Sequence, residues 1–178
     1  MLIVITGGAA SGKSEHAERV LCTHAPEGER LYLAAMQPFG EAAVRRIARH
    51  RALRAQKGFE TVERYTDLAG LALPRRYGGV LLECLSNLLA NECFSPDGTG
   101  FDGAETAILN GIEHLTRGCG TLVVVTNEIF EDGADYPAET ARYRALLARL
   151  NCALAARADA FAESVCGILV PLKGGDLL

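Results

Sequence analysis

Residues 7 to 14 have the types and the spacing of a loop that binds phosphate. They read Gly7-Gly8-Ala9-Ala10-Ser11-Gly12-Lys13-Ser14, which fits the pattern G-x-x-x-x-G-K-[ST]. Glycines let the backbone curl so that successive N–H groups face phosphate oxygens. Lys13 would place a compact cation at the β- and γ-phosphates, and Ser14 would offer a hydroxyl to Mg²⁺. The loop therefore predicts binding of a nucleoside triphosphate together with Mg²⁺.

The plain alternative is a glycine-rich turn that joins a strand to a helix and binds nothing. Every residue that the pattern requires is present, with an apolar run before the loop and a helical stretch after it, so the phosphate loop is favoured. The loop does not say which chemistry follows. The N-K-x-D sequence of regulatory GTPases is absent from the chain, which weighs against a GTPase switch.

Polar residues follow two other apolar runs. Glu83 comes directly after Val80–Leu82, where P-loop proteins place a carboxylate that organises Mg²⁺ or acts as a base. Thr126-Asn127-Glu128 comes after Leu122–Val125 and would emerge beside the phosphate loop if the two strands are neighbours. A solvated acid in the first case, and a turn asparagine with a solvated glutamate in the second, remain alternatives.

Basic residues gather around one histidine. Six of the 18 lysines and arginines lie between Arg45 and Lys57, on both sides of His50. Neighbouring cations disfavour a protonated imidazole, so they would keep His50 neutral and nucleophilic. The same arginines could hold a triphosphate and neutralise charge at a phosphorus under attack. A solvated helix face or a nucleic-acid patch is the bland alternative, and the other three histidines receive no role.

The elements that must position these residues alternate along the chain. Apolar runs predict strands at Leu2–Ile5, Leu31–Ala34, Val80–Leu82 and Leu122–Val125, with less regular candidates at Phe59–Tyr65 and Phe161–Leu172. Helices are expected at Ser11–Cys22, Glu41–Gln56, Ser86–Phe94, Ala104–Thr116 and Glu139–Arg157, and a turn-rich loop at Ser95–Gly103. Continuous apolar strands between helices predict a single α/β domain over residues 1–178, with a mostly parallel sheet covered on both faces.

Composition narrows the class of protein. The 178 residues are 49% hydrophobic and 22% charged, which excludes a disordered chain, and the net charge of −4 argues against a general nucleic-acid binder. The six cysteines include no C-x-x-C pair, so we expect reduced, mostly buried thiols in a cytoplasmic protein. The N-terminus has no signal-peptide pattern, and no apolar run is long enough to span a membrane.

Taken together, these segments resemble the bifunctional adenosylcobinamide kinase / adenosylcobinamide-phosphate guanylyltransferase family. The resemblance covers nearly the whole chain: ITGGAASGKSEHAE, YLAAMQPFGEAAVRRIARHR, LLECLSNLLANE, VVVTNE and LLARLNCALAARAD. Many families share a phosphate loop. Its combination with R-I-x-x-H-R and with the strand-end sequences LLEC and TNE is more specific.

The resemblance implies a P-loop, RecA-like fold, a homotrimer and two reactions. First, ATP or GTP phosphorylates the aminopropanol hydroxyl of adenosylcobinamide. Second, GMP from GTP passes through a covalent guanylyl-histidine, which corresponds to His50, and reaches the new phosphate to give adenosylcobinamide-GDP. The phosphate loop, Arg51, Glu63 and Glu83 would bind nucleotide, Ser14 and Glu83 would hold Mg²⁺, and Lys13, His50 and Glu83 would be catalytic. No nucleic-acid partner is expected.

The chain departs from the family pattern at three places. Ala10 stands where members commonly have arginine. The acidic cluster before the helix that carries His50, called the histidine helix below, is reduced to Gly40-Glu41. IFEDGADYPAET follows TNE in place of a glycine-rich stretch. These departures bear on nucleotide preference and corrinoid contacts. Two other functions remain alternatives: a small-molecule kinase without guanylyl transfer, and a nucleotide-gated binding module.

Overall fold

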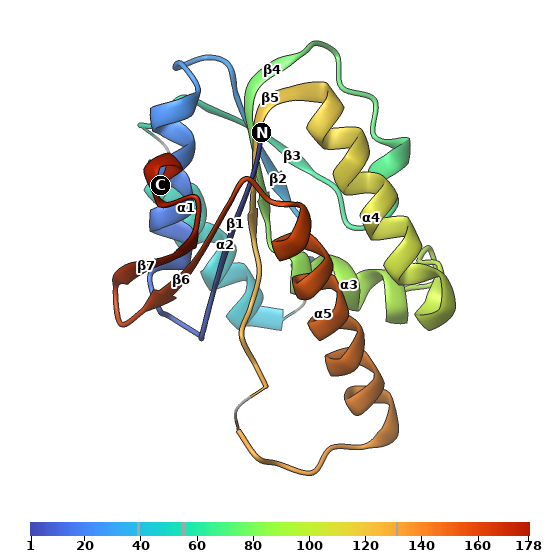
Figure 1. The fold of residues 1–178 in the computed structure, drawn as a ribbon. Coiled ribbons are helices and arrows are strands. Elements are labelled where there is room, and N and C mark those ends of the chain that lie inside the picture. Colours follow the sequence, from blue (N-terminus) through green and yellow to red (C-terminus); the bar gives the residue numbers. More distant parts are fainter. Residues whose placement is uncertain (39, 55, 131) are drawn as a thin grey trace.

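The computed structural model describes residues 1–38, 40–54, 56–130 and 132–178. Its centre is a sheet of seven strands in the order β3-β2-β4-β5-β1-β6-β7 (Figure 1). The first six strands are parallel, and β7 pairs with β6 in the antiparallel direction. The strands are β1 (Leu2–Gly7), β2 (Arg30–Ala34), β3 (Phe59–Glu63), β4 (Tyr77–Glu83), β5 (Cys119–Val125), β6 (Ala160–Val165) and β7 (Ile168–Lys173).

Helices cover both faces of the sheet. They are α1 (Lys13–His24), α2 (Gly40–Arg54), α3 (Leu85–Phe94), α4 (Gly100–Gly118) and α5 (Ala138–Arg157), with 3₁₀ turns at Leu68–Gly70 and Gly175–Leu177. Crossovers between parallel strands are right-handed. The helices that precede β2 and β3 therefore lie on one face of the sheet, and the helices that precede β5 and β6 lie on the opposite face. Accordingly α1 and α2 flank one side of the sheet in Figure 1, and α3, α4 and α5 flank the other.

The strands divide the core into two apolar layers because successive side chains point to opposite faces. Ile3 and Ile5 pack toward α1 with Ala17, Val20 and Leu21. The alternate residues of the same strands pack in a larger cluster under α3, α4 and α5. Parallel strands buried on both faces read as continuous apolar runs, which is the pattern the sequence carries. The expected α/β fold is therefore confirmed.

The element boundaries differ from the expectations at the loop before α4, and the less regular segment Phe161–Leu172 forms two strands, within the expected one or two. The second half of the expected loop Ser95–Gly103 is helical, because α4 begins at Gly100. Its glycines and aspartates are residues typical of turns, yet they form the first turn of a long helix. The segment Phe161–Leu172 forms two strands joined at Cys166-Gly167, where φ is +50° and +82°. Positive φ at both central residues is the geometry of a tight two-residue hairpin.

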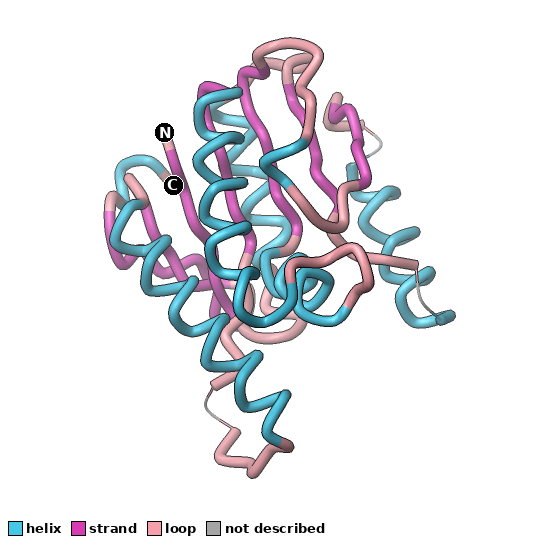
Figure 2. The backbone as a smooth tube through the Cα atoms, turned by 90° about the vertical axis from the view of Figure 1, so that its right-hand side faces the viewer, coloured by secondary structure: helices cyan, strands magenta, loops and turns pink. Residues whose placement is uncertain are grey.

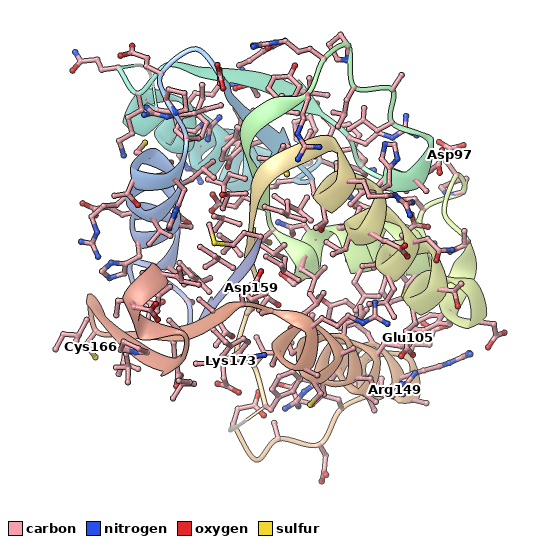
Figure 3. The ribbon with its side chains drawn as sticks, turned by 45° about the horizontal axis from the view of Figure 1, so that its top comes forward. Asp97, Glu105, Arg149, Asp159, Cys166 and Lys173 are labelled. Atoms are coloured by element: carbon pink, nitrogen blue, oxygen red, sulfur yellow. The ribbon has the colours of Figure 1, made fainter. Side chains whose placement is uncertain are left out.

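The polypeptide after β5 leaves the body of the domain. This segment and the N-terminal end of α5 extend below the sheet in Figures 1 and 2. On the body, α4 and α5 are joined by the pair that Figure 3 labels, Arg149 Nε donating to Glu105 at 2.9 Å. Among the helices of the described residues, none is long and apolar enough to cross a membrane.

Candidate functional site

The phosphate loop lies at the carboxyl end of β1, in the centre of the sheet. Gly12 has a φ of +95° and immediately precedes the first residue of α1, Lys13. The backbone at Ala10 is also left-handed, with a φ of +56°. The Lys13 ammonium donates a hydrogen bond to the carbonyl of Gly8 at 2.8 Å, across the curl of the loop. A helix N-terminus and a lysine thus face the same concave stretch of backbone, which suits an anion.

The hairpin between β6 and β7 supports the loop from behind, and sequence reasoning did not foresee this. The carbonyl of Ser11 accepts hydrogen bonds from the Ser164 hydroxyl at 2.7 Å and from the Gly167 amide at 2.9 Å. The buried His16 side chain reaches the carbonyl of Gly167 at 3.0 Å, and Arg19 donates to its other ring nitrogen at 2.8 Å. A guanidinium only donates, so Nε2 of His16 carries the hydrogen that binds Gly167.

Glu83 joins the loop to the neighbouring strand β2. The Ser14 hydroxyl donates to Glu83 Oε1, and the Tyr32 hydroxyl donates to Glu83 Oε2 at 3.1 Å. Burial, followed by the nearby Glu83 carboxylate, raises the pKa of the Tyr32 phenol, which therefore remains a donor. A serine hydroxyl beside a carboxylate offers the oxygen ligands that Mg²⁺ prefers, so this pair fits the ion together with nucleotide phosphates.

Sheet register places two acids in one row. Ala34 pairs with Glu63 on one side and with Glu83 on the other, and Glu83 pairs with Val125 of β5. Glu63 and Glu83 thus end two strands that are separated only by β2. Because alternate residues share a face, both point to the side of the sheet that α1 and α2 cover. The two predicted nucleotide-binding acids therefore lie at one edge of the same surface.

A pocket lies between this row and α2. Its lining combines the ends of β2, β3 and β4 with one side of α2: Tyr32, Ala34, Met36, Ile47, Arg51, Arg54, Thr61, Glu63 and Glu83. Arg51 forms an ion pair with Glu63 at 2.6 Å. Arg54 is only 6% exposed and stacks on the Tyr32 ring, 3.3 Å from the ring centroid. Its Nε and Nη1 are buried without a hydrogen-bond partner among the described residues.

The predicted nucleophile His50 belongs to α2, between two residues that line the pocket, Ile47 and Arg51. The side chain of His50 lies outside what the structure describes, as do those of Arg46 and Arg49. The backbone of α2 is nevertheless described from Gly40 to Arg54. The structure thus brings the histidine helix to the same pocket as Glu83, although the two segments are far apart in the sequence.

The C-terminal end of α2 is tied to the body by buried charge. Lys57 follows the helix and forms an ion pair with Glu18 of α1, which is 1% exposed. Arg30 of β2 donates to the carbonyl of Lys57 at 2.8 Å. The sequence shows Lys57 only as one member of the basic run, and no pattern in it indicates that Glu18 is buried beside it. Their pairing links the histidine helix to the helix that begins at the phosphate loop.

The residues after β5 are beside β1, as expected for neighbouring strands. They bond to protein groups: the Thr126 hydroxyl donates to Asn151 at 2.7 Å, and the Asn127 amide donates to the Ser86 hydroxyl. Glu128 accepts from the Phe130 amide at 2.8 Å. Their side chains thus serve to hold the start of the projecting segment against α3 and α5.

The remaining histidines and the thiols have structural settings. His24 and His114 each bond to a backbone carbonyl at 2.8 Å. All six cysteines, each of which is described, are free thiols, but the expectation that they are mostly buried is only half right. Cys84, Cys93 and Cys119 are buried, Cys22 is intermediate, and Cys152 and Cys166 are exposed. Burial raises the pKa of the Cys84 thiol, so it remains protonated.

A mostly parallel sheet with this loop at the end of its first strand defines a P-loop nucleotide-binding protein. The fold resembles the flagellar accessory protein FlaH of Methanocaldococcus jannaschii, with a TM-score of 0.50 and 12% identity over 99% of this chain and 79% of that one. Within this class, the chain belongs to the family described as cobinamide kinase / cobinamide phosphate guanyltransferase, whose model matches residues 3–172.

Curated relatives agree with that assignment over nearly their whole length. The bifunctional adenosylcobalamin biosynthesis protein CobU of Escherichia coli (strain K12) is 33% identical, with 97% of this chain and all of that protein aligned. The CobU protein of Salmonella typhimurium is 32% identical over the same shares. The CobP protein of Pseudomonas aeruginosa is 32% identical over 98% of both chains.

Proposed function

We propose that the protein phosphorylates adenosylcobinamide with a nucleoside triphosphate and then transfers GMP from GTP to the phosphate it has made, giving adenosylcobinamide-GDP. One observation carries the proposal beyond family membership. A single pocket is lined both by Glu83, which bonds to the phosphate-loop residue Ser14, and by Arg51 and Arg54 of the histidine helix. This arrangement supports a site in which phosphate binding and guanylyl transfer take place at one end of the sheet.

In the kinase step, the acceptor hydroxyl oxygen attacks the γ-phosphorus of ATP or GTP. The bond from that phosphorus to the bridging oxygen breaks, the nucleoside diphosphate leaves, and the hydroxyl proton is released to water. The loop amides and Lys13 neutralise the transferring phosphoryl group. Ser14 and Glu83 would hold Mg²⁺, which when bound offsets charge on the β- and γ-phosphates.

In the guanylyl step, a ring nitrogen of His50 attacks the α-phosphorus of GTP, a P–N bond forms and pyrophosphate leaves. A phosphate oxygen of the acceptor then attacks the same phosphorus, the P–N bond breaks and the histidine is regenerated. Arg51 and Arg54 lie where their guanidinium groups can neutralise charge on the nucleotide. The two free buried nitrogens of Arg54 face no partner among the described residues, which suits contact with an anionic ligand.

The test is incubation with α-labelled GTP followed by denaturation. The native protein should retain a label that is acid-labile and base-stable, as a phosphoramidate is, and His50→Ala should retain none. Arg45→Ala is the matched control on the same helix, because Arg45 is exposed, pairs with Glu41 and does not line the pocket. It should label like the native protein.

The outcomes separate the alternatives. Label in the native protein that survives in His50→Ala would show that another residue is the nucleophile. No label, with phosphorylation of adenosylcobinamide intact, would leave a small-molecule kinase. Nucleotide binding with neither reaction would leave a nucleotide-gated binding module. If another residue is the nucleophile, or if the protein is a small-molecule kinase, Lys13→Ala should lose the kinase step.

We further propose a cytoplasmic homotrimer. The free thiols suit a reducing compartment. On the edge strand β7, Ile168, Val170 and Leu172 are exposed at every second position, and Ile168 is 67% exposed. Such a stripe on one face of an edge strand suits contact with a second copy of the chain. Sedimentation should give three chains per particle, and Ile168→Asp should dissociate them; a monomeric native protein would contradict the proposal.

A further inference from the structure

A second pocket opens beside the first one. It lies where the segments that follow β2 and β3 meet the loop between α3 and α4, and Glu63 belongs to both pockets. Its lining is Gln37, Glu63, Arg64, Tyr65, Thr66, Ser95 and Asp97. Figure 3 labels Asp97, which lies at the edge of the molecule near α4. The lining is made of amide, hydroxyl and charged side chains, and the proposed reactions assign no role to it beyond Glu63.

The walls of this second pocket are fixed by two consecutive residues of α3. The Asn91 amide donates to the carbonyls of Ala35 at 2.8 Å and Tyr65 at 3.0 Å, and so joins the segments after β2 and β3. Glu92 accepts from the backbone amide of Asp67 at 2.7 Å with one oxygen. With the other it accepts from the amide and the hydroxyl of Thr99, both at 3.0 Å.

Glu92 is 1% exposed, so these protein donors take the place of water around its carboxylate. A buried carboxylate is strongly destabilising unless donors satisfy it, and here three donors do. The donors come from the segment after β3 and from the loop before α4, the two sides of the pocket. Three segments that have no regular structure of their own are thereby held in one arrangement. The pocket is a built feature of the fold.

The second pocket lies directly beside the first pocket, and the two share Glu63. Tyr65 donates its hydroxyl to Glu63 Oε2 at 2.7 Å, while Glu63 Oε1 pairs with Arg51 in the first pocket. Glu63 thus lies at the boundary between the second pocket and the first pocket, which is proposed to bind the nucleotide and is called the nucleotide pocket below. A molecule seated in the second pocket would lie next to the nucleotide, which is where an acceptor of its phosphoryl or nucleotidyl group must be.

We propose that the second pocket binds the amide side chains of the corrinoid acceptor. This inference rests on the proposed function and names a place for its second substrate. A corrinoid carries several primary amides around its ring, and each offers two donors and an acceptor. Gln37, Thr66 and Ser95 can exchange hydrogen bonds with such groups, and Asp97 adds a carboxylate that accepts from amide N–H groups and attracts the positive charge of the cobalt corrin.

The experiment measures steady-state kinetics of the kinase step with adenosylcobinamide as the varied substrate. It compares the native protein with the double variant Gln37→Ala/Thr66→Val. Each removed hydrogen bond weakens binding severalfold, so the KM for adenosylcobinamide should rise about tenfold. The KM for the nucleoside triphosphate should stay within about twofold, because the nucleotide pocket is unchanged. Guanylylation by labelled GTP without corrinoid should also be unchanged.

Asp97→Asn supplies a second, electrostatic test. It should raise the KM for adenosylcobinamide and reduce the dependence of that KM on salt, since exposed charges are screened by ions. Asp176→Asn is the matched control: Asp176 is also an exposed aspartate, but it lies near the C-terminus and does not line the pocket. Circular dichroism of each variant checks that the fold is retained.

The outcomes distinguish the two proposals. If the native protein phosphorylates adenosylcobinamide and both pocket variants keep the native KM for it, the second pocket is not the acceptor site and the proposed function stands. If both substrates lose affinity equally, the effect is not specific and the inference fails. If the native protein does not phosphorylate adenosylcobinamide at all, the proposed function falls and this inference falls with it.

Discussion

The Arg54 guanidinium stacks on the Tyr32 ring, and the hydroxyl of that ring donates to Glu83. Glu83 in turn accepts from Ser14 at the end of the phosphate loop. Four residues from four elements therefore form one continuous chain of contacts, from the loop to the C-terminal end of the histidine helix. The ring serves two purposes in this chain: its face holds α2, and its hydroxyl orients the carboxylate proposed to hold Mg²⁺.

Two substitutions of Tyr32 should separate these purposes. Tyr32→Phe keeps the face and loses the hydrogen bond to Glu83, which is worth about 1.5–3 kcal/mol when the acceptor is charged. We expect a higher Mg²⁺ requirement in the kinase step and little change in labelling by GTP. Tyr32→Leu also loses the cation–π contact, so labelling should slow as well. Equal effects of both variants on both reactions would contradict this division.

A second prediction concerns the ion pair between the partly exposed Lys57, just after α2, and the buried Glu18 carboxylate of α1. Lys57→Met leaves the carboxylate of Glu18, which is 1% exposed, without its cation, and should lower the free energy of unfolding by about 3 kcal/mol. Adding Glu18→Leu should restore most of that loss, because an apolar pair avoids the buried charge. Denaturant unfolding measures both effects.

The matched control for that pair is the ion pair of Arg117 with Glu113 on α4. Both side chains are mostly exposed, at 69% and 62%. Arg117→Ala should change stability by less than about 0.5 kcal/mol, because solvent screens such pairs. Equal losses in Lys57→Met and Arg117→Ala would mean that the Glu18–Lys57 pair does not hold the helix.

The parts of the site that are local in sequence could be predicted, and the parts that depend on register could not. The phosphate loop is eight consecutive residues, and Glu83 is recognisable because an acid ends an apolar run. That Tyr32 reaches Glu83 depends on β2 lying beside β4, with Ala34 paired to Glu83. No pattern in a single sequence fixes that pairing.

Charged residues that the fold buries were missed for a similar reason. Glu92 is surrounded by apolar and small residues in LLANE, which indicates a helix but not that the acid faces inward to receive three hydrogen bonds. In the sequence Arg54 is one of several arginines of the basic run, yet its guanidinium is buried over an aromatic ring. Composition reports the number of charges; only packing decides which of them lose solvent.

A third prediction concerns stability in alkaline solution. Burial raises the pKa of the Cys119 thiol from about 9 to about 11. Between these values the unfolded chain releases the proton while the folded chain retains it, so stability falls as pH rises past 9. At pH 10 the loss from this thiol is about 1 kcal/mol. Cys119→Ala should remove that part of the difference in unfolding free energy between pH 8 and pH 10.

Cys152→Ala is the control for this effect, because Cys152 is an exposed free thiol. It should leave the difference between the two pH values as it is in the native protein. Should Cys119→Ala show the full native loss, the thiol would have to be accessible to solvent in the folded chain.

The last prediction concerns the backbone of the phosphate loop. Gly12 has a φ of +95°, and a Cβ added to it would lie 3.4 Å from the Cα of Gly167 in the supporting hairpin. Gly12→Ala is thus strained in its own backbone at the point where α1 begins, and its Cβ would only touch the hairpin at an ordinary contact distance. We expect the affinity for GTP, measured by titration of a fluorescent analogue, to fall by more than tenfold, or about 1.4 kcal/mol.

Gly28→Ala is the control that shows the effect of backbone strain alone. Gly28 has a φ of +81° in the turn after α1, and a Cβ there would meet nothing within 4 Å. Both variants should lose about 1–2 kcal/mol of folding stability, because an L-residue is disfavoured in the left-handed region. Only Gly12→Ala should lose nucleotide affinity. If Gly28→Ala weakened GTP binding as much, general destabilisation would explain the result, and the loop geometry would not be what binds the phosphates.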